Sequence, residues 1–494
     1  MASTLKRLTG DTALYGLSSI LGRVLNFVLV PIHTKYMTES EYGVNSDLYS
    51  ILAFLMVLLT YGFETGFFRF SEKYKDRKML VYATATRSII TTTLIFLGII
   101  YLLQVPILDA LRYQDHPEYL WMLLFIISAD VMAAVPMAKL RSERRAKRFV
   151  RNRMVVIVVN VLLNVFFFMA LPEMSTWDGM LGDFGRWMYD PEVKVGYVLL
   201  ANLIANAFML LDLIPEFWKI RIGFDKAIWR EMLFFSFPLM LAGLAGVANE
   251  MIDRQFIKYL LPESESLEQL GIYSGVYKLS IALVLFNQAF RYAAEPLFFE
   301  EGEKGRDRTI FAQILRAFTV VMCLGLVSVL AFSDLLKELF LKNEDLWAGM
   351  EILPVLLIAN VFLGIHTNMS IWYKLSDQTR YGMYITGIGL VFTVVMNLLL
   401  IPPLGIMGAA YATLASYAAM AISSYAFGQI HYPIPYDVKT ILFYLLISSV
   451  LGYLAFVYSG VHILISLLCV LGYIAVVAVV EREMIMKIVH RLKG

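Results

Sequence analysis

A polar stripe near the start of the chain is the first place where the residue types could do chemistry. Four polar residues follow the spacing i, i+4, i+8 and i+11 within an apolar run, so a helix would carry them on one face. They are Tyr15, Ser19, Arg23 and Asn26. An ionisable side chain inside a membrane costs roughly 2.5 to 3.5 kcal/mol on insertion scales, and it normally faces a cavity or a partner. We expect Arg23 and Asn26 to line an anion-binding cavity; the alternative is an ion pair between Arg23 and an acid of a neighbouring helix.

A second set of charged residues lies within and just beyond the apolar run 272–293. Lys278 lies about two turns into this run, whereas Arg291 and Glu295 share a stripe towards its other end. Lys278 and Arg291 differ by thirteen positions, which places them on different faces of a helix. We therefore expect Lys278 to be a cavity cation, and Arg291 to be a partner of Glu295 or of a phosphate.

The apolar run 233–257 carries further charges near its end. Glu250 and Arg254 form an i, i+4 pair in the favourable order, and Asp253 occupies the next face. We take Asp253 and Arg254 as candidates for substrate contact, although a structural ion pair explains the same pattern.

Acids within the apolar runs are candidates for coupling transport to protons or ions. Asp47 and Glu64 lie near the ends of predicted spans, where a solvated acid is the default, and Asp130 lies deeper. Glu295 is a further candidate because it follows Arg291 on the same stripe. Each of these assignments requires that the carboxyl group is buried.

The sequence offers little for covalent or metal chemistry. Cys323 and Cys469 each lie inside an apolar run, and the six histidines are scattered along the chain. A catalytic site would need a nucleophile, acid or base with a positioned partner. We therefore predict that the protein is not an enzyme, and we expect no catalytic residue, metal ion or cofactor.

The elements that must position these residues are membrane-spanning helices. Of the 494 residues, 59% are hydrophobic and only 17% are charged, which is more apolar surface than a soluble protein of this size could bury. Runs of about 20 apolar residues match a helix that crosses roughly 30 Å of hydrocarbon. We predict an all-α membrane protein with about fourteen spans, at 13–33, 45–66, 82–103, 119–138, 154–171, 195–214, 233–257, 272–293, 311–332, 350–371, 382–401, 405–427, 440–457 and 461–480.

The positions of the basic residues predict the orientation. Most of the 42 Lys and Arg residues fall in alternate loops, and positively charged loops remain cytoplasmic. This pattern puts both chain ends inside, and it also puts the basic segment 141–149 inside. The acidic, Trp-containing loop 172–194 falls outside, where its tryptophans are typical of interfacial anchors.

An internal repeat predicts the domain organisation. Residues 43–49 return as 271–277, and the phrase at 64–68 returns as 295–299. An even number of spans separates the copies, so the repeat is parallel, and its halves should enclose a cavity. We predict an N-terminal lobe at 1–230 with six spans, a C-terminal lobe at 231–430 with six spans, and two extra helices with a tail at 431–494.

Several stretches in this order resemble one known family. They are residues 18–23 with Tyr42-Gly43, 63–70, 145–149, 235–239, Asp253-Arg254, 271–274 and 405–413. The chain resembles the polysaccharide (O-antigen/lipopolysaccharide) flippases of the multidrug/oligosaccharidyl-lipid/polysaccharide (MOP) exporter superfamily. The resemblance implies translocation of an undecaprenyl-diphosphate-linked oligosaccharide across the bacterial cytoplasmic membrane by alternating access. It also implies membrane lipids and polysaccharide polymerase or glycosyltransferases as partners, and no nucleic acid.

Two other classes remain open. The first is a drug or metabolite antiporter of the same superfamily, which would have twelve spans and an ion-binding acid in its first lobe. The second is a membrane enzyme, either a polysaccharide polymerase with a large outside loop or an acyltransferase with a deep catalytic histidine.

Overall fold

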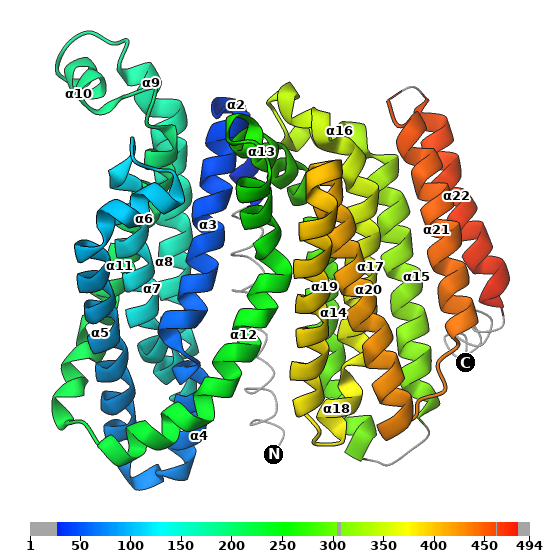
Figure 1. Ribbon diagram of the computed structural model, residues 1–494, viewed down its shortest axis with the longest axis horizontal. Helices are drawn as coiled ribbons and strands as arrows, with labels where there is room; N and C mark the ends of the chain where they lie inside the picture. Colours follow the sequence, from blue (N-terminus) through cyan, green and yellow to red (C-terminus); the bar gives the residue numbers. More distant parts are fainter. Residues whose placement is uncertain (1–26, 304–307, 461, 483–494) are drawn as a thin grey trace. The chain divides into compact units, whose positions relative to one another are not determined.

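The computed structural model describes residues 27–303, 308–460 and 462–482, and within these ranges it is helical with no β-strand (Figure 1). The helices up to α12 are α2 (Val30–Tyr36), α3 (Glu39–Thr60), α4 (Phe63–Lys73), η1 (Lys75–Arg77), α5 (Lys78–Leu102), α6 (Gln104–Leu111), α7 (Pro117–Ser142), α8 (Ala146–Val165), the π-helix η2 (Phe166–Ala170), α9 (Leu171–Met174), α10 (Met180–Met188), α11 (Lys194–Phe217), η3 (Trp218–Ile222) and α12 (Lys226–Leu260). The later helices are α13 (Glu263–Leu279), α14 (Ile281–Glu303), α15 (Thr309–Ala331), α16 (Ser333–Phe340), η4 (Glu344–Ile352), α17 (Leu353–Met369), α18 (Ile371–Leu375), α19 (Arg380–Leu404), α20 (Ile406–His431), α21 (Val438–Tyr458) and α22 (Ile463–Val480).

The helix lengths confirm a multi-pass membrane protein. In the described residues, twelve helices are long and apolar enough to cross a membrane, and α13 with the start of α14 forms a thirteenth span that is bent by 47°. These helices agree with the second to fourteenth predicted spans. The first predicted span, 13–33, lies mainly outside the described residues. The all-α prediction of about fourteen spans is therefore confirmed.

The chain divides into two compact units, Met1–Met251 and Ile252–Gly494. In the first unit, α7 is the central helix, because α3, α4, α5, α8 and α11 all pack against it. Its interior side chains include Leu123, Ile127 and Val131, each at most 2% exposed. Within the membrane, close van der Waals packing and hydrogen bonds between helices hold the unit together, because lipid tails solvate apolar side chains as well as other helices do.

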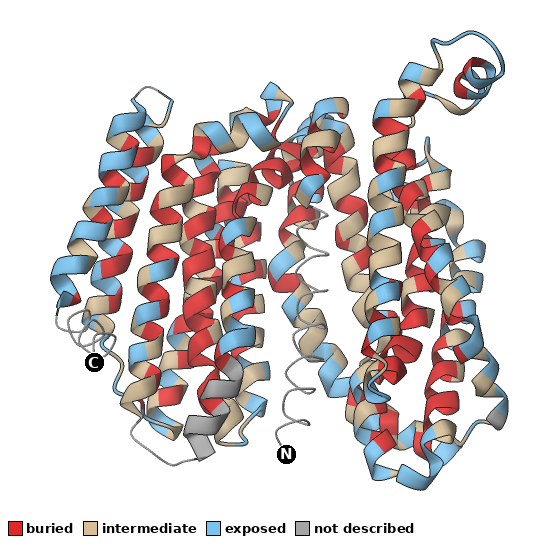
Figure 2. Cartoon of the chain, turned by 180° about the vertical axis from the view of Figure 1, so that it is seen from behind, coloured by how far each residue is buried: buried red, intermediate tan, exposed pale blue. Residues whose placement is uncertain are grey.

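In the second unit the central helix is α17, which packs against α13, α14, α15, α20 and α21. Buried residues face the interior of this unit, whereas α22 is largely exposed (Figure 2). The predicted boundaries at 230/231 and 430/431 come from the repeat, and they remain a prediction.

Polar contacts fix the two C-terminal helices onto α15. Glu481, just after α22, accepts hydrogen bonds from Arg316 Nε of α15 and Tyr444 of α21, both at 2.6 Å. Asp437 caps the N-terminus of α21, and the side-chain and backbone hydrogen bonds of Thr440 hold the pKa of Asp437 below its ordinary value. Helices α21 and α22 are therefore an integral part of the second unit.

The second predicted span is broken into two helices. A capping box between Thr38 and Glu41 starts α3. At the other end of α3, Tyr61 and Gly62 both adopt left-handed backbone conformations, with φ of 36° and 74°. The helical hydrogen bonds are interrupted there, and α4 begins after the break.

Candidate functional site

A pair of glycines brings α4 and α12 of the first unit close together. A Cβ atom added at Gly62 would lie 3.0 Å from the Ser236 carbonyl oxygen, and one added at Gly66 would lie 2.7 Å from Ser236 Oγ. Small residues at this four-residue spacing allow helix backbones to approach closely in membranes. The two helices are thus fixed at one level, and the side chains beyond that level form the walls of a pocket.

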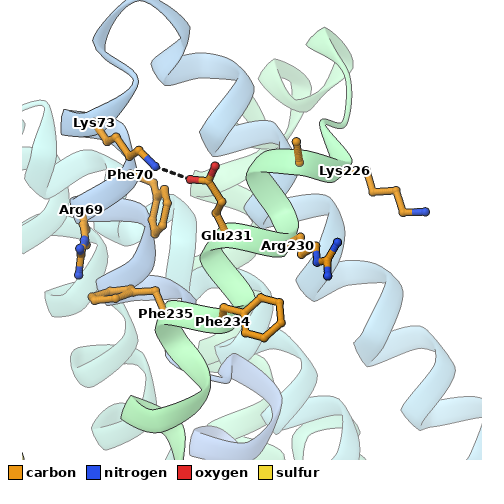
Figure 3. Close-up of a pocket in the computed structure, with 9 residues that line it drawn as sticks. Arg69, Phe70, Lys73, Lys226, Arg230, Glu231, Phe234 and Phe235 are labelled. Atoms are coloured by element: carbon orange, nitrogen blue, oxygen red, sulfur yellow. Dashed lines mark hydrogen bonds and ion pairs between the residues drawn. The ribbon is translucent and has the colours of Figure 1, made fainter.

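This pocket has a volume of about 850 Å³ and opens to the outside of the unit. We call it the α4–α12 pocket. Its lining residues are Arg69, Phe70, Lys73, Lys226, Ala227, Arg230, Glu231, Phe234 and Phe235 (Figure 3). The lining therefore contains four basic side chains, three phenylalanines and one carboxylate.

The carboxylate in the pocket has its own partners. Glu231 forms an ion pair with Lys73 at 2.5 Å (Figure 3). It also accepts a hydrogen bond from the Tyr74 hydroxyl at 2.9 Å. In the part of the chain that the structure describes, no carboxylate lies within ion-pair distance of Arg69, Lys226 or Arg230. The pocket therefore has an excess of positive charge.

Aromatic rings orient the two arginines. The Arg69 guanidinium lies 4.2 Å from the ring centroid of Phe235, and that of Arg230 lies 5.7 Å from the ring of Phe234. A guanidinium above a ring is held by a cation–π interaction and keeps its hydrogen-bonding fork free for an anion. The arrangement can bind a phosphorylated or carboxylated ligand.

Three predicted site residues lie on α12 and α13 in the second unit, namely Asp253, Arg254 and Lys278. Asp253 and Arg254 form a buried ion pair at 2.9 Å, and Tyr273 donates a hydrogen bond to the same carboxylate. The Arg254 guanidinium also lies over the ring of Tyr277, 4.8 Å from its centroid. Lys278 lies in the last turn of α13, beside the bend that precedes α14.

Arg291, predicted for the same region, lies on α14 with an exposed side chain over the ring of Tyr292. The contacts of the Glu295 side chain lie outside the described residues, so the predicted Arg291–Glu295 pair stays a prediction. Arg23 and Asn26 also lie outside the described residues.

The predicted coupling acids of the first unit have separate environments. Asp47 is fully buried and accepts a hydrogen bond from Tyr113 at 2.6 Å. Glu64 is half-buried and pairs with Arg141 of α7. Asp130 lies on α7 with the Asn206 side chain as a hydrogen-bonding neighbour. The structure does not bring these three acids into one cluster.

An ion cluster that the sequence did not predict surrounds Glu216 near the end of α11. This carboxylate is completely buried. Its partners, at 2.7 to 2.8 Å, are Lys139, Arg145, Arg148 and Lys219. Two of them belong to the basic segment 141–149, which the sequence explained by topology alone. Glu216 is 68 to 77 positions away in the sequence from its partners on α7 and at the start of α8. The sequence alone therefore does not indicate this pairing.

The residues of the α4–α12 pocket were also missed. A usable signal exists, because Arg69 and Lys73 on one helix and Lys226 and Arg230 on another are each spaced i, i+4. Both pairs lie beside phenylalanines, so each helix presents a basic, aromatic face.

The arrangement of helices is similar to that of solved membrane transporters. The lipid II flippase MurJ, solved in an inward closed conformation, matches with a TM-score of 0.71 at 14% identity, over 96% of this chain and 99% of MurJ. A multidrug resistance MATE family transporter of the MOP superfamily, solved in an inward-facing conformation, matches with a TM-score of 0.60 at 14% identity, over 83% of this chain and 94% of the other. At this identity the likeness describes the fold alone.

The sequence comparisons identify the family. Residues 8–301 match the model of the polysaccharide biosynthesis protein family, which is more than half of the chain, so the protein belongs to this family. A curated protein of Haloferax volcanii, named "Probable low-salt glycan biosynthesis flippase Agl15", is 24% identical over 229 residues. That alignment spans 46% of this chain and 47% of the relative, about half the length of each. The resemblance to polysaccharide flippases of the MOP superfamily is confirmed.

Proposed function

We propose that this protein is a flippase that moves an undecaprenyl-diphosphate-linked oligosaccharide across the bacterial cytoplasmic membrane by alternating access. Membership of the polysaccharide biosynthesis family supports a lipid-linked glycan as cargo. The name of the Haloferax relative and the fold of MurJ support flipping as the activity. The positive-inside pattern supports cytoplasmic N- and C-termini.

The observation that carries the proposal is the charge pattern of α12. Lys226 and Arg230 lie in its first turns, and Arg254 and Lys258 lie near its other end, where they are 6% and 0% exposed. Between Lys226 and Arg254 an ideal α-helix would rise about 42 Å, which is close to the 40–45 Å thickness of a bilayer with its headgroups. One helix therefore supplies cations at the levels of both headgroup layers.

A diphosphate needs such cations on both sides of the membrane. Its charge is strongly hydrated, and it enters a low-dielectric path only where protein donors replace the water. We propose that the cargo-binding residues of the transport path are Arg23, Asn26, Lys278, Arg291, Asp253 and Arg254. We further propose that coupling to protons or ions uses one or more of Asp47, Glu64, Asp130 and Glu295.

The experiment is an export assay in a bacterial strain whose surface polysaccharide depends on this protein. Arg23→Ala and Lys278→Ala should each abolish surface polysaccharide, because each removes a cation from the membrane-embedded path. Lys439→Ala is the matched control and should retain export, because Lys439 is an exposed lysine in the first turn of α21. Normal surface polysaccharide with both cavity variants, at equal amounts of membrane protein, would contradict the assigned roles.

A further inference from the structure

We propose that α10 is an interfacial helix, whose apolar face inserts into the headgroup layer of the lipid leaflet beside it. The helix lies in the loop between two predicted spans, and the positions of the basic residues assign this loop to the outer side (Figure 1). The sequence indicated only that the tryptophans of the loop are typical of interfacial anchors. The proposal concerns a surface away from the α4–α12 pocket, and it does not depend on the identity of the cargo.

The residues of α10 fall into three sectors around the helix. At 100° per residue, the apolar side chains occupy about one third of the circumference, and the glycines and the charged side chains occupy the other two sectors. Four side chains of the apolar sector are between 43% and 87% exposed, namely Met180, Leu181, Phe184 and Trp187. Large apolar side chains exposed together on one face indicate an interaction surface.

The glycine sector packs α10 against the chain that precedes it. A Cβ atom at Gly182 would clash with the Trp177 carbonyl oxygen. One at Gly185 would lie 2.6 Å from the Ser175 backbone nitrogen. The Arg186 guanidinium donates hydrogen bonds to the same stretch, at 2.9 Å to the Trp177 carbonyl oxygen. The side of α10 that contacts protein is therefore built of glycine and polar groups, whereas a helix of a water-soluble protein buries its apolar side.

The end of α10 lies at the level where the span α11 begins. The Tyr197 hydroxyl donates a hydrogen bond to the Met188 carbonyl oxygen at 2.8 Å and accepts one from the Asp190 backbone N–H at 2.6 Å. Tyr197 is only about 5 Å along α11 from its first residue, Lys194. Met188 and Tyr189 also pack against the core of the first unit. Because a span begins in the headgroup layer, α10 lies beside this layer.

Lipid is the partner that fits this position. The span that leads to the hairpin already has an apolar surface that lipid covers, with Leu162 of α8 and Met169 of η2 62% and 49% exposed. Methionine, leucine, phenylalanine and tryptophan are side chains that insert into the boundary between headgroups and acyl chains, and tryptophan favours the headgroup level. The exposed sector of α10 therefore continues the contact of this unit with lipid.

The charge of the loop predicts how the helix binds lipid. Residues 172–194 contain five acidic residues and two basic ones, and within α10 Asp183 pairs with Arg186 at 2.7 Å. Interfacial helices that bind anionic lipids carry lysines and arginines on their polar face, and the net negative charge of this loop opposes such an attraction. We therefore expect α10 to bind through its apolar face, independently of anionic lipid and of salt.

The test measures the surroundings of single side chains of α10. In the full-length protein without Cys323 and Cys469, a nitroxide spin label is attached at Met180→Cys or Trp187→Cys, and the protein is placed in phosphatidylcholine liposomes. Electron paramagnetic resonance then compares collisions with oxygen, which concentrates in lipid, and with a water-soluble nickel chelate. We expect an oxygen-to-nickel ratio about fivefold higher at both positions than at Asp183→Cys, the matched control in the charged sector. The measurement does not depend on which way the protein inserts.

A variant of the apolar face should remove this difference. With the label at Met180→Cys, the pair Leu181→Gln and Trp187→Gln should lower the ratio to that of Asp183→Cys, because the face loses its apolar contact with lipid. Trp218→Gln is the control, since it removes an exposed tryptophan from another loop and should leave the ratio unchanged. Addition of phosphatidylglycerol or of salt should also leave the ratio at Met180→Cys nearly unchanged.

Frequent nickel collisions at Met180→Cys and Trp187→Cys, equal to those at Asp183→Cys, would place the apolar face in water and overturn the proposal. Rare collisions with both reagents would show burial against protein, such as a second copy of the chain, and would overturn it too. An unchanged ratio in the glutamine variant would exclude the apolar sector as the cause. A ratio that rises only with phosphatidylglycerol would contradict binding through the apolar face.

Discussion

At the scale of single residues, buried charged side chains form ion pairs with other side chains of the protein. The Glu216 carboxylate is the clearest case, because it is fully buried and contacts basic side chains from α7, from the start of α8 and from η3. Arg148 also bonds to the Asp212 backbone carbonyl, which ties the same helices a second time. These contacts join the ends of three membrane helices of the first unit through one acid.

Replacing this acid tests the cluster. Glu216→Gln should lower the free energy of unfolding by roughly 3 kcal/mol, because it leaves the buried Lys139 ammonium with less compensation. Reversible unfolding of the purified protein by sodium dodecyl sulfate in mixed micelles would measure the change. Asp183→Asn is the control, since Asp183 is 76% exposed and its pair with Arg186 should contribute less than about 0.5 kcal/mol. Equal stability of Glu216→Gln and the parent protein would show that the cluster does not hold the helices.

Residue types alone predicted only some of these contacts. The polarity of Asp253 and Arg254 within an apolar run indicated a buried site, and the structure shows both side chains buried. Tyr273, which donates a hydrogen bond to Asp253, lies on the next helix and could not be identified, because a hydrophobicity pattern does not show the contacts of a tyrosine hydroxyl. For the same reason, the sequence did not identify Tyr113 as the hydrogen-bond partner of Asp47.

Close helix contacts shape the site at the element scale. Gly62 and Gly66 of α4 lie against Ser236 of α12, and Met232 also approaches Gly66. In lipid, such contacts gain energy from close packing because lipid tails already solvate apolar side chains. The width of the α4–α12 pocket therefore depends on these two glycines as well as on the Lys73–Glu231 ion pair, which also joins the two helices.

A pair of glycine substitutions tests this dependence. Gly66→Ala should destabilise the protein by about 1 to 2 kcal/mol, because the new Cβ atom would lie 2.7 Å from Ser236 Oγ. Gly98→Ala should instead stabilise it by about 0.5 to 1 kcal/mol, since a Cβ atom there meets nothing within 4 Å and alanine favours the helix. The same unfolding assay would give both values, and changes of the same sign would contradict the proposed close contact.

The elements themselves were largely predictable because the length of an apolar run fixes the length of a spanning helix. The interruptions were not predictable. The bend between α13 and α14 at Ser280 and the break between α3 and α4 at Tyr61 occur within continuous apolar runs. Helix–helix contacts compensate for the lost backbone hydrogen bonds at such positions, and a single sequence does not show these contacts.

At the scale of the whole molecule, the distribution of charged residues predicts the orientation of the protein in the membrane. The cluster of Glu216 and the α4–α12 pocket both use basic residues of loops that the sequence assigns to the cytoplasm. The hairpin of α9 and α10 belongs to an acidic loop that is assigned to the other face. This orientation is a prediction from the positive-inside rule.

Cysteine labelling tests this orientation. In a variant without Cys323 and Cys469, Asp183→Cys should react with a membrane-impermeant maleimide in intact cells. Lys147→Cys, also at an exposed position, should react only after the membrane is permeabilised. The reverse pattern would invert the predicted topology, and it would place the α4–α12 pocket on the outer face.

The break at Tyr61 and Gly62 separates the short helix α4 from α3. An unbroken helix transmits its tilt along its whole length, whereas the left-handed residues Tyr61 and Gly62 interrupt the helix between α3 and α4. The part beyond the break is the eleven residues of α4, about 16 Å long, and Arg69 and Lys73 lie towards its far end. A small rotation at Tyr61 would therefore carry one wall of the pocket by several ångströms while α3 keeps its place in the core of the first unit.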